Sequence, residues 1–275
     1  MNKRMLFKPE LVYEYMKRYH YFPKVGEFLL MILDAKLQLI NINYHCITES
    51  FISIMKKSYV PKMSGVMIIY HCDQPKCVID AFRLLGIDIV DIFYIKNHTL
   101  IGYNSKEVYG ILPNIRNDFI NNKPIIYPNM DNLINHTLKD LLIGTFMETI
   151  NFKLLKVIEL FKNLDQEYFV LMMIDYQKRV REVLIPFKGG LNSSIVDPRV
   201  LIKYFVDDNF GFCVMFHNHP SGIVDPSKED LMITERFKAI MKLFNKELYA
   251  HYILGRYEIY EIINKKLLDI TNKVL

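Results

Sequence analysis

Residues 217–230 read HNHPSGIVDPSKED, and this stretch decides how the rest of the chain is interpreted. His217 and His219 are two residues apart, so on an extended backbone both imidazoles point to the same side and can reach one point. The proline and glycine residues that follow turn the chain and bring the Asp230 carboxylate back towards them. Two imidazoles and one carboxylate leave the fourth position of a tetrahedral zinc ion open to water, as in catalytic zinc sites. We therefore expect a metal site at His217, His219 and Asp230.

A purely structural interpretation exists for each part of this stretch. Ser227 and Asp230 are three residues apart at the start of an expected helix, which is the pattern of a capping box. A His-x-His pair on its own is also usually without a metal. Only the combination of the two features at this spacing favours a metal site.

The complete pattern is His-x-His-Pro, six residues, Ser, two residues and Asp, and it resembles the motif of the JAMM (JAB/MPN) metallohydrolase family. Further residues are similar to its RadC-like branch, namely Pro220-Ser221-Gly222, Pro226-Ser227, Asp230 and Thr234. The resemblance implies an α/β (α+β) fold of the cytidine-deaminase-like type, with a mixed sheet flanked by helices. It also implies a Zn2+ ion held by His217, His219 and Asp230, with Ser227 helping to stabilise an oxyanion.

The same resemblance places a glutamate general base at the entrance to the first strand of the domain. Glu167 has this setting, because it directly precedes the apolar segment 168–174 and lies fifty residues before His217. Glu182 is the alternative; it lies on the next expected strand beside Arg181, where a solvated or ion-paired carboxylate is the more ordinary interpretation. One departure from the RadC-like pattern is Ala250 before His251, where related sequences have Asp.

The two halves of the chain repeat the same order of segments. FLLMILD at 28–34 is mirrored by FVLMMID at 169–175, and the apolar segment before His71 is mirrored by the one before His217. Repetition at so long a period suggests duplicated domains. We expect a degenerate JAB/RadC-like domain at 1–120 and a RadC-like JAB domain with the intact motif at 128–275. An unrelated α/β domain in the first half is the alternative.

The first half lacks the predicted metal ligands. Asp73 takes the place of the second histidine, and Leu84 stands where the sequence comparison puts the carboxylate. Asp80 is a candidate replacement only if the loop is shifted. We therefore expect no metal in this half and a structural or recognition role. Glu27 precedes its first strand, much as Glu167 does in the second half.

Periodicity predicts the secondary structure of both halves. The expected helices cover residues 8–20, 49–57, 75–85, 131–144, 148–164 and 228–244, with one more starting at Asp197. The expected strands cover residues 28–34, 37–43, 65–70, 88–95, 99–103, 169–175, 180–186, 212–216, 248–254 and 257–262. The turn residues of 121–124 and 128–129 predict a linker.

Composition limits the class of protein. The 275 residues are 51% apolar and 24% charged, with a net charge of +5, which is typical of a globular protein of one large or two modest domains. The four cysteines are irregularly spaced, so we expect reduced thiols. No signal-peptide core and no apolar run of the roughly 18–20 residues needed for a bilayer is found, so we expect a cytoplasmic protein without membrane contact.

The function predicted from these features is zinc-dependent hydrolysis of a peptide or isopeptide bond. The partner would be a peptide or protein substrate, including a ubiquitin-like conjugate. Nucleic acid is not supported by a basic patch, because the densest cluster, at 178–181, is small. Two alternatives remain open: a non-catalytic binding or scaffold protein of mobile DNA or DNA repair, and a metal-dependent nuclease. The sequence leaves open the substrate, whether the protein is active, and its oligomeric state.

Overall fold

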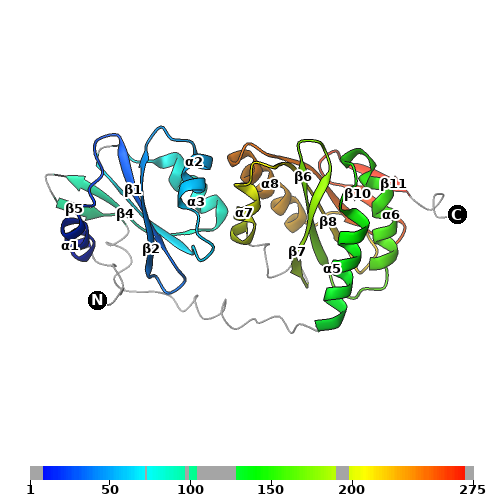
Figure 1. The fold of residues 1–275 in the computed structure, drawn as a ribbon. Coiled ribbons are helices and arrows are strands. Elements are labelled where there is room, and N and C mark those ends of the chain that lie inside the picture. The colour runs from blue at the N-terminus through cyan, green and yellow to red at the C-terminus, as the bar shows by residue number, and fades with distance from the viewer. Residues whose placement is uncertain (1–8, 72, 97–98, 104–127, 190–197, 270–275) are drawn as a thin grey trace. The chain divides into compact units, whose positions relative to one another are not determined.

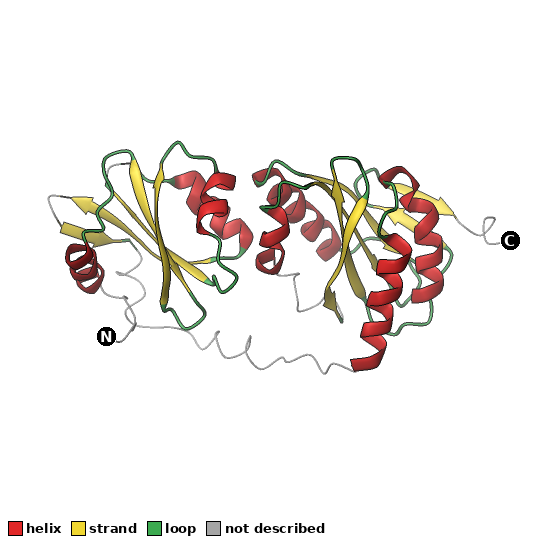
Figure 2. Ribbon diagram, in the orientation of Figure 1, coloured by secondary structure: helices red, strands yellow, loops and turns green. Residues whose placement is uncertain are grey.

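The computed structural model describes residues 9–71, 73–96, 99–103, 128–189 and 198–269. By their contacts the residues divide into two compact units, 1–125 and 126–275. Each unit is a mixed β-sheet flanked by helices, which confirms the α+β architecture (Figure 1, Figure 2). None of the helices in these ranges is long and apolar enough to cross a membrane.

The sheet of the second unit has the strand order β11-β10-β9-β8-β6-β7. Its strands are β6 (Tyr168–Asp175), β7 (Val180–Lys188), β8 (Phe210–Asn218), β9 (Glu247–Leu254), β10 (Glu258–Glu261) and β11 (Lys266–Asp269). The central strand β8 pairs antiparallel with β6 and parallel with β9, and α8 (Lys228–Leu243) connects β8 to β9. Both edges of β8 are therefore hydrogen-bonded, which gives the histidines at its end a rigid base.

Helices cover the two faces of this sheet. On one face, α5 (Pro128–Leu142) and α6 (Ile150–Phe161), joined through the 3-10 turn η2 (Met147–Thr149), pack on alternate residues of β6 such as Val170 and Met172. α8 covers the other face, where Phe237 contacts Phe169 with ring centroids 6.4 Å apart. The 3-10 turn η3 (Pro198–Leu201) and α7 (Ile202–Phe205) lie between β7 and β8 in the chain. Because Phe169 faces α8, the residue paired with it on β8, His217, also faces α8.

The sheet of the first unit has the strand order β2-β1-β3-β4-β5. Its strands are β1 (Glu27–Leu33), β2 (Leu39–Cys46), β3 (Gly65–Tyr70), β4 (Asp88–Lys96) and β5 (Thr99–Gly102). The helix α1 (Pro9–Tyr19) packs on one face through Val12 and Met16, and α2 (Phe51–Ser58) and α3 (Lys76–Leu85) complete the unit. Strands β3 and β4 are parallel and the other pairs antiparallel, so order and directions match those of β6 to β10.

Two backbone irregularities fall at matching places in the two sheets, whereas the shifts of β6–β7 after Phe169 and of β6–β8 after Ile174 have no counterpart in β1–β2 or β1–β3. The β1–β2 pair shifts register after Ile32, and β6–β7 shifts after Met173. The parallel pairs shift after Val66 in β3 and after Cys213 in β8. Such bulges are specific features of a sheet rather than random defects.

Turns and helix ends agree as well. Leu37 and Lys178 both have a positive φ, 59° and 63°, and both donate their N–H to the carbonyl of the aspartate three residues earlier. Gly86 after α3 and Asn245 after α8 also have positive φ, 72° and 52°, and donate to carbonyls three residues back. Glycine and asparagine are the residues that most easily adopt this left-handed conformation at a helix end.

These matches correct the residue correspondence drawn from the sequence. Phe28 lies opposite Tyr70 and Phe169 lies opposite His217, so Tyr70, not His71, is the counterpart of His217. Glu27 likewise corresponds to Tyr168 and not to Glu167, because both directly precede the matched phenylalanines.

The helix α3 is shorter than α8 at its beginning. Counted back from the matched ends at Gly86 and Asn245, Lys76 at the start of α3 corresponds to Glu235. The first turns of α8 therefore have no helical counterpart among the described residues before α3. Leu84, which the sequence comparison assigned to the ligand position, lies in the last turn of α3 instead.

The predicted helices and strands are confirmed with shifts of a few residues at their ends, apart from two differences. Strand β11 was not predicted, and the helix expected from Asp197 is a 3-10 turn followed by the short α7. Asp197 itself and the linker residues 121–124 lie outside the described residues, whereas residues 128–129, which were predicted as linker, begin α5.

A buried polar cluster fixes α2 to β2 in the first unit. His45 is 1% exposed; its Nε2 lies 2.7 Å from the Ser58 hydroxyl and its Nδ1 3.0 Å from the Glu49 carboxylate. Burial acts to raise the pKa of Glu49, but hydrogen bonds from Lys57, Ser53 and His45 outweigh it and lower the pKa to about 2. The carboxylate is therefore stabilised as an anion in the folded state.

We expect Glu49→Gln to lower the free energy of unfolding of the first unit by about 1–3 kcal/mol at pH 7, the usual contribution of hydrogen bonds to a charged group. Because the folded pKa lies below the ordinary value of 4.5, this contribution is complete above pH 4.5 and is lost as the pH falls towards 2. Urea unfolding of the intact chain, followed through amide NMR signals of α2, measures the difference. Glu14→Gln, at an exposed position, is the matched control. A wild-type to Glu49→Gln difference that does not change with pH would contradict this assignment.

Candidate metal centre

His217 lies near the end of β8, where the sheet holds it on three sides. It is 1% exposed, pairs in register with Phe169 of β6 and Ile253 of β9, and stacks on the Phe169 ring at 5.8 Å between centroids. His219 follows the strand, and its N–H donates to the Leu254 carbonyl at 3.1 Å. The two imidazoles point to the same side, as the spacing predicts, and their Nε2 atoms are 3.1 Å apart.

Asp230 is held at the start of α8 by the predicted capping box. Its Oδ2 accepts hydrogen bonds from the N–H of Ser227 at 2.8 Å and from the Ser227 hydroxyl at 2.7 Å, and its own N–H donates to that hydroxyl at 3.1 Å. Its Oδ1 is buried and has no hydrogen-bond partner among the residues that the structure describes. One carboxylate oxygen therefore orients the side chain while the other faces the histidines.

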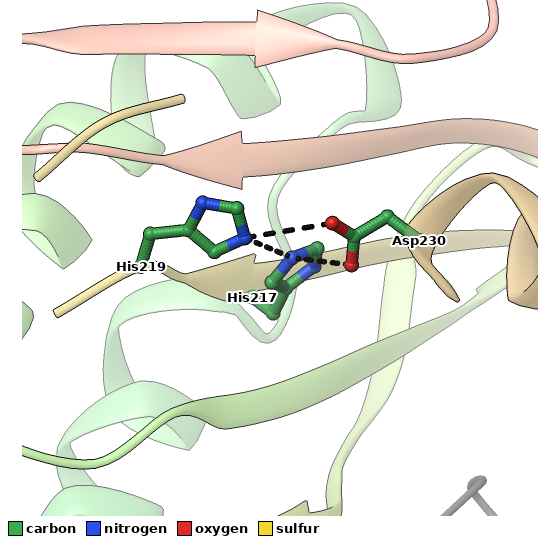
Figure 3. Close-up of side chains that lie close together, drawn as sticks. All are labelled: His217, His219 and Asp230. Carbon is green, nitrogen blue, oxygen red and sulfur yellow. Dashed lines mark hydrogen bonds and ion pairs between the residues drawn. The ribbon is translucent and has the colours of Figure 1, made fainter. Parts of the chain in front are cut away.

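These three side chains converge on one point (Figure 3). His217 Nε2 is 3.0 Å from Asp230 Oδ1, and His219 Nε2 is 3.6 Å from Asp230 Oδ2. Ligand atoms bound about 2.0–2.1 Å from a tetrahedral zinc ion are roughly 3.3 Å apart, a value within the observed range. The donor set and the buried, unsatisfied Oδ1 both fit a metal ion. Among the described residues this is the one group of at least three His, Cys, Asp or Glu side chains that could hold one.

The electrostatics of the centre favour a cation. Burial acts to raise the pKa of the Asp230 carboxyl, but His217, His219 and Ser227 outweigh it and hold that pKa well below its usual value. Burial acts to lower the pKa of His219, but Asp230, the Ile223 carbonyl and the charge of Glu167 more than offset it, so the pKa is raised. The centre therefore carries a carboxylate anion and attracts positive charge.

Glu167 lies directly before β6, at the same end of the sheet as His217. Side chains alternate along a strand, so continuing β6 back by one residue would direct Glu167 to the same face as Phe169, which contacts α8. Its charge contributes to the raised pKa of His219, after the larger effects of Asp230 and the Ile223 carbonyl. The position agrees with the predicted general base, whose role stays a prediction.

Glu182 lies elsewhere. It is on β7 opposite Met173 and forms a salt bridge of 3.3 Å with Lys139 of α5. Met173 is four residues along β6 from Phe169, which amounts to roughly 13 Å of strand. Glu182 is therefore an ion-paired carboxylate remote from the histidines, and the geometry favours Glu167 over it.

Asn218, between the two histidines, was missed by the sequence analysis. Its side chain is 3% exposed; Oδ1 accepts from the N–H of Tyr168 at 2.8 Å, and Nδ2 donates to the carbonyl of Gln166 at 3.1 Å. These two bonds hold the backbone on both sides of Glu167. The strand that carries the histidines therefore also fixes the segment that carries the candidate base.

Two further buried polar residues, His251 and Thr234, are connected to His217 by hydrogen bonds. His251 of β9 is fully buried between His217 and Thr234 of α8, with its Nε2 3.0 Å from His217 Nδ1. The sequence showed His251 only through the missing aspartate before it, and Thr234 only as part of the family resemblance. Ser227 caps α8 and donates to Asp230, and its predicted oxyanion role stays a prediction.

Comparison with known proteins finds relatives of part of the second unit. Residues 151–267 match the family described as RadC-like JAB domain. A UPF0758 protein of Staphylococcus aureus (strain NCTC 8325 / PS 47) is 40% identical over 94 residues, which cover 34% of this chain and 43% of that protein. A UPF0758 protein of Clostridium perfringens (strain 13 / Type A) is 39% identical over 99 residues, 36% of this chain and 44% of its own length. The chain thus spans less than half the length of these relatives.

We expect Asn218→Ala to speed amide exchange at Tyr168 by about fivefold, because a hydrogen bond of this kind contributes about 1 kcal/mol. Amide hydrogen exchange followed by NMR measures the rate. Asn218→Asp keeps an oxygen that accepts from Tyr168 and is the matched control, with slow exchange retained. Equal protection of Tyr168 in the wild type and in Asn218→Ala would show that this side chain does not hold the Glu167 segment.

Proposed function

We propose that this chain, whose residues 151–267 match the RadC-like JAB domain family, is a zinc-dependent hydrolase. The observation that carries the proposal is the convergence of His217, His219 and Asp230 on one buried point with a glutamate beside it. Structural zinc sites usually have four protein ligands, whereas three leave a position for water. A site with two histidines, one carboxylate and a nearby base suits hydrolysis.

A bound zinc ion would supply Lewis-acid catalysis and activate water as a nucleophile. The chain's own residues do the rest. Glu167 accepts a proton from the attacking water and returns it to the leaving group. Asn218 keeps the Glu167 segment in place through Gln166 and Tyr168. Ser227 keeps Asp230 oriented through the capping box.

The substrate bond that we propose is an amide, either a peptide or an isopeptide bond. This choice follows the resemblance of the His-x-His and Ser-x-x-Asp motif to hydrolases of the JAMM type. Specificity depends on loops and partners, and the fold alone does not determine it. A peptide or protein substrate is therefore the class to test first.

We propose further that the first unit is a degenerate copy of the second that binds no metal. The two units share their strand order, two register shifts, and residues with positive φ at matching places in a turn and after a helix. Tyr70 replaces His217, and the helical turns that carry Asp230 have no counterpart, so two ligands are lost together. Such a unit suits a structural or recognition role.

We expect the purified chain to bind about one equivalent of zinc, since a single complete ligand set is found among the described residues. His219→Ala should abolish tight binding, because one of three ligands is removed. Metal analysis by mass spectrometry after dialysis measures the stoichiometry. His71→Ala in the first unit is the matched control and should leave the zinc content unchanged. Two equivalents in the wild type, or undiminished zinc in His219→Ala, would overturn the assignment of the site.

We expect Glu167→Gln to retain zinc but to lose hydrolysis by roughly 10² to 10⁴-fold, the usual contribution of a general base. Initial rates on peptide and isopeptide substrates, with zinc content determined in parallel, measure the effect. Glu182→Gln removes an ion-paired carboxylate far along the sheet and should remain active. Loss of activity in Glu182→Gln but not in Glu167→Gln would reassign the base. Zinc binding by the wild type without hydrolysis of any amide substrate would contradict the hydrolase proposal and favour a binding role.

A further inference from the structure

A chain of buried hydrogen bonds leads from the metal centre through the sheet to α8 and back. Nδ1 of His217 lies 3.0 Å from Nε2 of His251, whose Nδ1 lies 2.7 Å from the Thr234 hydroxyl. That hydroxyl donates to the backbone carbonyl of Asp230 at 2.5 Å. The side chains involved are almost fully buried, with exposures of 1% for His217, 0% for His251 and 1% for Thr234. This series of hydrogen bonds therefore begins and ends at residues of the metal centre, His217 and Asp230.

The position of each proton in this chain follows from its far end. A backbone carbonyl only accepts hydrogen bonds, so the Thr234 proton points to Asp230. The Thr234 oxygen must then accept from His251, which therefore carries its proton on Nδ1. The Nε2 of a neutral His251 is then an acceptor, and it takes the proton on Nδ1 of His217. This leaves the lone pair of His217 Nε2 directed at His219 and Asp230.

We propose that Thr234 and His251 are positioning residues that lock His217 in the tautomer able to bind the metal through Nε2. The inference rests on the proposed metal function and specifies how the site is prepared for it. Partners behind metal-binding histidines commonly fix the ring and the tautomer in this way. Here the partner of His217 is the His251 imidazole. The Thr234 hydroxyl, which donates to the Asp230 carbonyl, orients that imidazole.

The first unit shows that the fold does not need a polar residue at this place. In the matched register of β4 and β9, Ile92 is the counterpart of His251, and it is 4% exposed in the same kind of buried strand. A buried imidazole is costly unless its nitrogens are hydrogen-bonded. The second unit therefore contains a histidine that packing does not require, beside a ligand that needs an acceptor for its Nδ1 proton.

His219 reaches the same tautomer by a different route. Its Nδ1 lies 2.7 Å from the carbonyl of Ile223, which also only accepts, so its proton is on Nδ1 and its Nε2 faces the centre. This anchor is backbone and does not involve Thr234 or His251. His219 is therefore an internal reference for any change at His217.

The test compares Thr234→Val, which keeps the shape but loses the hydroxyl, with Thr234→Ser, which keeps the hydroxyl. Zinc affinity is measured in the full chain by competition with a chelator. Tautomers are measured in the metal-free chain at alkaline pH by long-range 1H–15N NMR of 15N-labelled histidine. Ile240→Val, another buried position on α8, controls for loss of stability without a change in the hydrogen bonds.

We expect Thr234→Val to weaken zinc binding by about 10 to 100-fold and to give His217 a mixture of tautomers, with His219 unchanged. Thr234→Ser and Ile240→Val should bind zinc much as the wild type does. Wild-type zinc affinity in Thr234→Val, or a proton on Nε2 of His217 in the metal-free wild type, would overturn the proposal. A wild type that binds no zinc would overturn the assignment of the metal centre. The tautomer spectra would still decide whether the hydrogen bonds through His251 and Thr234 fix the His217 ring.

Discussion

Three hydrogen-bond acceptors meet at one buried point in the second unit: Nε2 of His217, Nε2 of His219 and Oδ1 of Asp230. Acceptors at such distances repel one another, and burial removes the water that would separate them, so the arrangement needs a positive charge. A metal ion could supply this charge, and so could a proton. The raised pKa of His219 and the lowered pKa of Asp230 both reflect this demand.

The surrounding structure keeps these acceptors together in spite of their repulsion. β8 is hydrogen-bonded on both edges, the capping box fixes Asp230, and His251 and Thr234 connect the strand to the helix. The first unit has the same strand order and two of the same register shifts, but its described residues lack the first turns of the long helix. The sheet can therefore form without a metal centre, and the site depends on the added helical turns together with the polar residues that face them.

Local patterns in the sequence predicted most helices, most strands and the three side chains that converge, because alternation along a strand and helix capping act over a few residues. Asn218 and His251 could not be assigned roles in this way, since their partners Tyr168 and His217 are 50 and 34 residues away and meet them only through sheet register. The sheet register also shows that the counterpart of His217 is Tyr70, whereas the sequence had suggested His71. Strand β11 is four residues long and pairs at the sheet edge, so it has too few residues to show alternation.

X-ray absorption at the zinc edge of the zinc-loaded chain tests the central claim most directly, because it identifies the ligand atoms themselves. We expect two imidazole nitrogens and oxygen ligands at about 2.0–2.1 Å, with no sulfur. A sulfur ligand at about 2.3 Å, or a spectrum without the scattering of two imidazoles, would show that zinc is bound elsewhere and would contradict a metal centre at His217, His219 and Asp230.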